Sequence, residues 1–295
     1  MRRQFPTLVV ILAGLGPILL FGWLTGGLTA SEVGETRSMS ALEQFAQAAA
    51  GLGIKPLYSL LCLGLILFLW GQRARDISSL RWGLVAFWTG ETFCAINFWV
   101  FQHESLLSEY LHSYGMVLAF GLTIFAARTA AKTRLLKRNE STGRWRIGWV
   151  ALVITAILCF IPLMAPVSPH TYTVSIHGFP YSYTRFALYE WYENRALPLL
   201  ALTCCILAII PLLRKNSFWS SALLSAALGA LTFSLFRLVL DVIFHETLVW
   251  FEFWEEASEL LYILGVGLLL WRFKHLLEKT GPVHWLLDDK RKSHV

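Results

Sequence analysis

Charged side chains are scarce in this chain of 295 residues. Asp, Glu, Lys and Arg make up 15% of it, whereas hydrophobic residues make up 56%. The mean hydropathy is +0.56. Soluble domains carry about 25% charged residues. A composition so poor in charge therefore excludes a soluble globular domain of this length.

Cysteines and the sequence motifs of soluble enzymes are also few or missing. The chain has no P-loop, no Rossmann glycine fingerprint, no His-Glu-x-x-His helix and no Gly-x-Ser-x-Gly elbow. All the cysteines fall within apolar stretches, so no extramembrane disulfide framework is indicated. The five cysteines are Cys62, Cys94, Cys159, Cys204 and Cys205.

Long apolar stretches recur along the chain at a length that suits a membrane. The hydrocarbon core of a bilayer is roughly 30 Å thick and takes about 20 apolar residues of helix to cross. These stretches are too long and continuous for barrel strands, so the sequence predicts an all-α integral membrane protein embedded in the lipid bilayer. The eight predicted transmembrane helices cover about residues 7–28, 55–72, 80–102, 109–131, 146–167, 195–213, 218–244 and 248–273.

Lys and Arg are distributed unevenly among the segments that connect these spans. Alternate segments hold 20 of the 25 basic residues, and the opposite segments hold four. Because basic residues accumulate on the cytoplasmic side, both termini are predicted to be cytoplasmic. The net charge of +6 is therefore assigned to membrane topology and not to nucleic-acid binding. Short loops favour the bacterial inner membrane as the location of this multi-pass chain.

The chain resembles itself at an offset of 142 residues. This shift pairs Pro56 with Pro198, and it pairs the His-Glu dipeptide at His103 with that at His245. Both halves also share one order of loops: a long outer loop, a short basic inner loop and a short outer hairpin. We therefore predict two parallel four-helix repeats related by a pseudo-two-fold axis along the membrane normal. The predicted units are residues 1–142 and 143–276, followed by a cytoplasmic tail, 277–295.

Four ionisable residues fall inside predicted spans, where each charge costs roughly 2.5–3.5 kcal/mol or more. At 1.5 Å per residue, Glu91 and Glu259 would lie roughly 16 Å below the outer ends of their helices, near the midplane. Arg237 reaches a similar depth and is predicted to pair with Glu259, whereas Glu91 has no evident basic partner. Such residues usually mark functional sites. Together with Asp241, they form the predicted catalytic or coupling group.

Histidines and carboxylates gather toward the outer ends of the same helices. Glu109 and His112 have the Glu-x-x-His spacing that four-helix bundles use for carboxylate-bridged metals. The stretch WFEFWEEASELL places several carboxylates on one helical face. Carboxylates neutralise hard cations and imidazole binds them, so the pattern predicts a transition metal as cofactor: iron, copper, manganese or zinc. The predicted metal ligands are His103, Glu109, His112, His245, Glu252, Glu255 and Glu256.

Other interpretations of these histidines stay open at this point. His103 and His245 also suit helix ends at the membrane interface, where a polar tip meets water. Haem bound by two histidines is a minor alternative, because a haem pocket prefers apolar surroundings to a ring of carboxylates. Chains of Glu, Asp and His within a membrane also serve as proton relays.

Three functions are compatible with this pattern. The first is a membrane metalloprotein whose site on the outer, periplasmic face serves redox or hydrolytic chemistry. The second is a proton- or cation-coupled transporter that uses the midplane charges. The third is a non-catalytic scaffold subunit, with a membrane or periplasmic protein partner on the aromatic outer face. Residues 40–53 and 181–194 are predicted to form further helices on that face.

Overall fold

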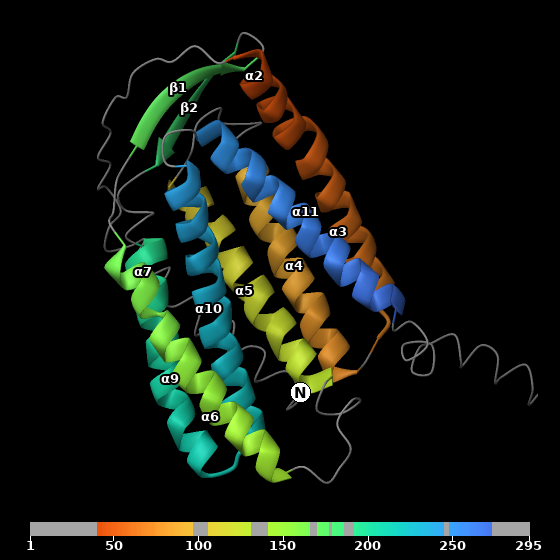
Figure 1. The fold of residues 1–295 in the computed structure, drawn as a ribbon. Coiled ribbons are helices and arrows are strands. Elements are labelled where there is room, and N and C mark those ends of the chain that lie inside the picture. Colours follow the sequence, from red (N-terminus) through yellow and green to blue (C-terminus); the bar gives the residue numbers. More distant parts are fainter. Residues whose placement is uncertain are drawn as a thin grey trace, which may run out of the picture.

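The computed structural model describes residues 40–72, 74–96, 106–130, 141–165, 170–176, 179–185, 192–244 and 248–272. Within these ranges the chain forms seven long helical rods and one β-hairpin (Figure 1). The helical class predicted from the sequence is therefore confirmed, with the hairpin as an exception to the all-α prediction. The predicted first span, 7–28, and the predicted tail, 277–295, lie outside the described residues.

The first rod begins earlier in the chain than the sequence predicts. It runs continuously through α2 (Ala41–Ala48), the π-helical segment η1 (Ala49–Ile54) and α3 (Lys55–Leu69). A capping box starts it: the Glu43 N–H donates to the Ser40 hydroxyl at 3.2 Å, and the Ser40 N–H donates to the Glu43 carboxylate at 2.9 Å. The helix predicted over 40–53 is thus confirmed, and it places Lys55 inside the rod.

Two π-helical segments precede prolines in this fold. Segment η1 ends two residues before Pro56, and η4 (Tyr192–Ala196) ends two residues before Pro198 of α9 (Leu197–Leu213). Proline has no N–H to donate to the turn before it, and a π-helical turn changes the hydrogen-bond register at that point. The two segments end 142 residues apart, which is the offset of the predicted repeat.

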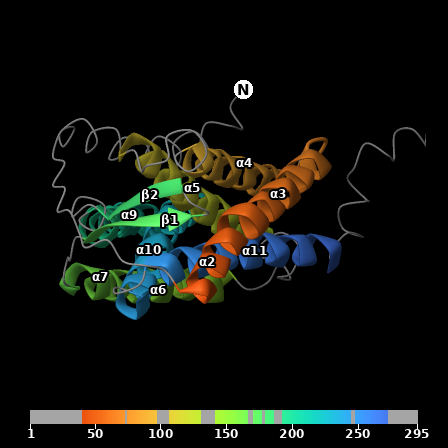
Figure 2. The ribbon, with the colours of Figure 1, turned by 90° about the horizontal axis from the view of Figure 1, so that it is seen from above.

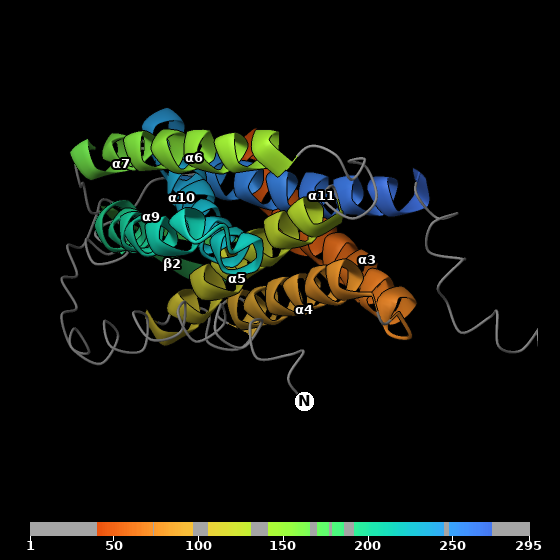
Figure 3. The same ribbon diagram turned by 90° about the horizontal axis from the view of Figure 1, so that it is seen from below.

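The remaining rods complete a bundle with α5 and α10 at its centre. Helices α6 and α9 lie on one flank, and α3, α4 and α11 lie on the other (Figures 1 and 3). Of the apolar spans, α5 and α10 are the most buried. The bounds of these helices are α4 (Arg75–Ile96), α5 (Leu106–Ala130), α6 (Ser141–Leu158), α7 (Phe160–Met164), α10 (Ser217–Phe244) and α11 (Leu248–Arg272).

A two-stranded antiparallel hairpin lies at the end of the bundle where α2 begins (Figures 1 and 2). Strand β1 (His170–Ile176) pairs with β2 (Phe179–Arg185), with His170 opposite Arg185. The helix predicted over 181–194 is wrong for residues 181–185, which belong to β2. In YSYTR, aromatic and polar residues alternate with a period of two, which is the strand period and not the helix period.

Five of the rods in the described part of the chain are long and apolar enough to cross a membrane: Ala41–Leu69, Leu107–Ala130, Arg146–Met164, Tyr192–Leu213 and Phe218–Phe244. Helices α4 and α11 have 22 and 25 residues. Those lengths reach about 33 and 38 Å, but both helices are more polar. Their role as spans stays a prediction. The outward faces of α3, α9 and α11 expose leucine and isoleucine side chains, as lipid-facing surfaces do.

The packing does not reproduce the predicted pseudo-two-fold axis. Helices α4 and α5 pack along each other over much of their length. Their counterparts at the 142-residue offset, α10 and α11, touch much less, because α10 packs chiefly on α9 and α5. Two parallel repeats, and eight helices in total, therefore stay predictions.

Glycines set the distance between the central helices. A Cβ atom built on Gly115 of α5 would lie 2.6 Å from the Ala86 carbonyl oxygen and 2.8 Å from the Gly90 Cα of α4. Helices α5 and α10 approach in the same way at Gly121 and Gly229. Small residues allow this close approach in membrane proteins, where packing rather than the hydrophobic effect holds helices together.

Replacing Gly115 with Ala is expected to push α5 away from α4. Overpacking of this kind costs about 1–3 kcal/mol, and we expect a lower thermal unfolding midpoint in detergent. Gly64→Ala is the matched control, because a Cβ there meets nothing within 4 Å. Equal midpoints for Gly115→Ala and the unmodified protein would contradict this account of the helix contact.

Candidate metal centre

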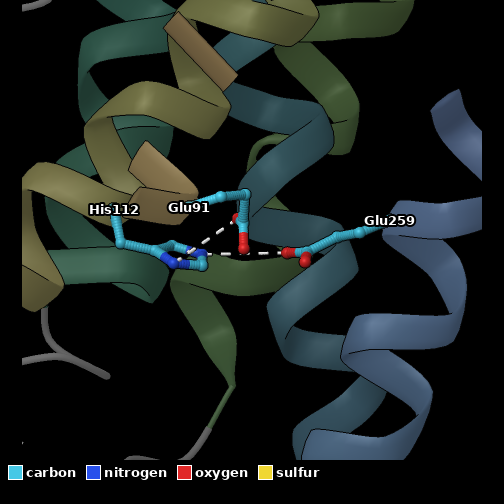
Figure 4. Close-up of side chains that lie close together, drawn as sticks. All are labelled: Glu91, His112 and Glu259. Atoms are coloured by element: carbon cyan, nitrogen blue, oxygen red, sulfur yellow. Dashed lines mark ion pairs between the residues drawn. The ribbon is translucent and has the colours of Figure 1, made fainter. Parts of the chain in front are cut away.

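Three buried side chains from three different helices converge near the hairpin end of the bundle. They are Glu91 of α4, His112 of α5 and Glu259 of α11 (Figure 4). Their exposed fractions are 1%, 3% and 2%. One donor atom from each residue lies within 4.8 Å of the other two. Residues that are 168 positions apart in sequence, Glu91 and Glu259, thus share one site.

The distances within this group are too long for hydrogen bonds, and a single ion could take one ring nitrogen of His112 together with one oxygen of each glutamate. His112 Nδ1 lies 3.6 Å from Glu91 Oε1, and His112 Nε2 lies 3.8 Å from Glu259 Oε1. With metal–ligand bonds of about 2.0–2.2 Å, two ligands in a tetrahedral site are about 3.4 Å apart. Both ring nitrogens, Glu91 Oε1 and both oxygens of Glu259 are buried and have no hydrogen-bond partner among the described residues. Unsatisfied buried groups of this kind are rare, and they point to a ligand.

The second oxygen of Glu91 is held by the first rod. Lys55 Nζ lies 3.0 Å from Glu91 Oε2, and the Tyr58 hydroxyl contacts the same oxygen. These contacts leave Oε1 to face His112. The prediction that Glu91 has no basic partner is therefore wrong. The reason is that Lys55 lies within the rod and not in a loop before it.

Lys55 and Tyr58 also join Glu91 to Glu256. Lys55 Nζ lies 2.5 Å from Glu256 Oε1, and the Tyr58 hydroxyl lies 2.6 Å from Glu256 Oε2. A tyrosine hydroxyl has one proton to donate, yet this one contacts carboxylate oxygens of both glutamates. A second hydrogen bond requires a proton on one of the two carboxylates. Hydrogen bonds from the Tyr58 hydroxyl to both glutamates thus require that Glu91 or Glu256 is protonated.

Arg237 of α10 forms the other half of the charged cluster. Its guanidinium pairs with Glu255 of α11 and, at 2.9 Å, with Glu193 of η4. The rings of Phe251 and Phe233 cover it, with centroids 4.8 and 5.9 Å away. Asp241 and Glu109 are close enough to act on it electrostatically.

The predicted ion pair between Arg237 and Glu259 is wrong. Helices α10 and α11 run antiparallel and meet through the connection between Phe244 and Leu248. Arg237 lies seven residues before the end of α10, and Glu255 lies seven residues after the start of α11. Arg237 and Glu255 are therefore equally far from the connection between the two helices and can pair. Glu259 lies one helical turn farther from it.

The structure brings together only part of the predicted ligand set. His112, Glu255 and Glu256 join Glu91 and Glu259 in the cluster. The Glu252 carboxylate accepts a hydrogen bond of 2.7 Å from the Gln47 amide. Glu109 and Asp241 lie on the Arg237 side of the cluster and are partly exposed. His103 and His245 lie outside the described residues.

Three residues of the cluster were missed in the sequence: Lys55, Tyr58 and Glu193. One signal for Lys55 was available, since it is one of only four basic residues in the predicted outer segments and is flanked by apolar sequence. Including residues 40–53 in the span would have made it an intramembrane charge. Tyr58 and Glu193 carry no comparable signal, because tyrosines and glutamates are common near span ends.

Comparison with protein-family models, with curated proteins and with solved structures gives no match to this chain.

Replacing Lys55 with Met is expected to destabilise the protein, because Glu91 and Glu256 would then be buried without their cation. Breaking a buried pair from one side costs about 3–5 kcal/mol. We expect a lower unfolding midpoint in detergent, measured by circular dichroism. The double variant Lys55→Met/Glu256→Gln removes a cation and an anion together, so it should recover part of the loss. If the double variant is less stable than Lys55→Met alone, the proposed pairing is incorrect.

Proposed function

We propose that this chain is an integral membrane metalloprotein that holds one divalent metal ion between Glu91, His112 and Glu259. The site serves redox or hydrolytic chemistry at the membrane. One observation carries the proposal: one donor atom from each of these three buried residues lies within 4.8 Å of the other two, and donor atoms of all three residues have no hydrogen-bond partner among the described residues. A metal ion satisfies such atoms at once, whereas leaving each of them unsatisfied costs about 1–3 kcal/mol or more.

The charges around the site support a divalent ion. Two permanent cations, Lys55 and Arg237, face five buried or nearly buried carboxylates. The excess of negative charge in a low-dielectric interior favours further positive charge at the site. A divalent metal supplies it, together with protons on the carboxylates. The five carboxylates are those of Glu91, Glu193, Glu255, Glu256 and Glu259.

The donor types support zinc, manganese, iron or copper(II) over copper(I). Carboxylates are hard ligands that suit manganese, and imidazole suits zinc, iron and copper. The site contains no thioether or thiolate donor of the kind that selects copper(I); within the described residues, Cys94 contacts Lys55 at 3.3 Å and belongs to the surrounding contacts. Haem is disfavoured by the same carboxylates.

The distribution of Lys and Arg supports an orientation in which the site is nearer to the outer face than to the cytoplasmic face. The hairpin end of the bundle holds the start of the first rod and the start of α11 (Figure 1). Those ends adjoin the segments poor in basic residues, which the positive-inside rule assigns to the periplasm. With this orientation, a lipid-soluble or periplasmic substrate reaches the site from outside.

Elemental analysis of the detergent-purified protein tests the metal site. After reconstitution with zinc, manganese, iron or copper, we expect about one equivalent of metal in the unmodified protein. His112→Ala and Glu259→Gln should lose it, because each removes a donor atom. Glu252→Gln should keep it, because Glu252 lies on the same helix but bonds to Gln47.

Three outcomes would overturn the metal proposal. The first is an unmodified protein without metal after reconstitution with all four ions. The second is metal that survives both ligand substitutions. The third is an equal loss in Glu252→Gln, which would indicate adventitious binding to acidic residues.

A second candidate, a proton-coupled transporter, is supported by the order of the same side chains. Glu256, Tyr58 and Glu91 are linked by hydrogen bonds through the Tyr58 hydroxyl. His112 then lies between Glu91 and Glu259, with one ring nitrogen toward each. Five groups that carry protons thus lie in series, hydrogen-bonded from Glu256 to Glu91 and separated by 3.6 and 3.8 Å on the two sides of His112, and such series serve as proton relays in pumps and transporters.

Proton flux into liposomes tests this second candidate. The full chain is reconstituted with a pH-sensitive dye inside, and a potassium gradient with valinomycin drives protons inward. Transport through the series predicts flux that Tyr58→Phe and Glu259→Gln both abolish and that Glu252→Gln leaves unchanged. Flux equal to that of empty liposomes would exclude an uncoupled proton pathway through the protein.

A further inference from the structure

Glu255 lies beside the proposed metal ligands without being one of them. Its Oε1 lies 3.9 Å from His112 Nε2, and the corresponding distance for Glu259 Oε1 is 3.8 Å. The two carboxylates come from the same helix, four residues apart, and thus from the same helical face. Glu255 is not among the donor atoms that lie within 4.8 Å of one another, so it is a near neighbour of the group that would become a fourth protein ligand only by moving toward it.

Arg237 holds this carboxylate back. Its guanidinium pairs with Glu255 Oε1, the same oxygen that faces His112. The guanidinium itself is fixed, because Glu193 lies 2.9 Å from it and the Phe251 ring covers it. Glu193 is held in turn through its backbone, where its carbonyl accepts a 2.5 Å hydrogen bond from the Ser234 hydroxyl.

We infer that Arg237 keeps one coordination position of the proposed metal open by withholding Glu255 from it. The inference rests on the proposed metal site at Glu91, His112 and Glu259. Zinc sites with four protein ligands are closed and structural, whereas catalytic zinc sites have three and keep the fourth position for water or substrate. By binding Glu255, Arg237 keeps the number of protein ligands at three. It thus acts as a positioning residue and does not itself contact the metal.

The charge of Arg237 suits this role better than that of a neutral hydrogen-bond donor. A buried glutamate next to a divalent ion is strongly drawn to it, and only another cation can compete for the carboxylate. Arginine presents several N–H donors in a rigid fork and stays charged. It can therefore bind Glu255 and Glu193 together, while its aromatic neighbours exclude water from the pair.

Cobalt(II) and azide provide a direct test with the detergent-purified full chain. Cobalt reports its coordination through visible absorption, and azide binds where a position is open. The unmodified protein should bind cobalt and show an azide-dependent spectral change. Arg237→Gln should release Glu255 onto the metal, weakening azide binding by about tenfold or more, within the range reported for substitutions around metal ligands. The double variant Arg237→Gln/Glu255→Gln should regain azide binding.

Glu255→Gln alone decides the question if Arg237→Gln does not fold. With Glu255 withheld from the metal, this variant should keep both cobalt affinity and azide binding close to those of the unmodified protein. A loss of cobalt affinity by more than about tenfold would show that Glu255 is already a ligand and would overturn the inference. Azide binding that is unchanged in a folded Arg237→Gln would overturn it as well. Absence of cobalt from the unmodified protein would instead overturn the proposed metal site, and this inference with it.

Discussion

Charge compensation inside an apolar bundle is the constraint on which this structure depends. Each buried carboxylate has lost its hydration and is stable only beside a cation, a proton or a metal ion. Lys55 and Arg237 provide two of these charges, each shared between two glutamates from different elements. The first rod, α4, α10, η4 and α11 are thereby joined through one cluster. The cluster therefore contributes to the stability of the bundle, and it also contains the candidate site.

The helix contacts place the cluster as much as the charges do. Gly90 and Gly115 let α4 and α5 approach at backbone distance, directly beside Glu91 and one turn from His112. A wider spacing would draw these two side chains apart and leave their donor atoms unable to share an ion. The close approach therefore offsets part of the cost of burying the charges, because it allows one ligand to satisfy several of them.

Hydropathy predicts the helical class of this fold well, since long continuous apolar stretches are typical of helices and not of strands. Hydropathy and charge predict the site only in part. Glu91, His112 and Glu259 are recognisable as intramembrane or helix-spaced polar residues. Their partners depend on which helices are in contact and on how far each residue lies from the end of its helix. Arg237 and Glu255 both lie seven residues from the ends at which α10 and α11 are connected, and for this reason Arg237 pairs with Glu255 and not with Glu259. Lys55 was counted with the outer segments because the predicted span, 55–72, begins at it, whereas the helical rod begins fourteen residues earlier.

That continuation through η1 also determines which way the first rod faces. In an uninterrupted α-helix, Gln47 and Lys55 would point about 80° apart, because eight residues at 100° exceed two turns by that angle. One residue absorbed by a π-helical turn reduces the difference to about 20°. Both side chains can then reach α11, Gln47 at Glu252 and Lys55 at Glu256. The π-helical turn thus rotates α3 relative to α2 about the helix axis. As a result, Gln47 and Lys55 face the same side of the rod and contact two residues of α11 that are one helical turn apart.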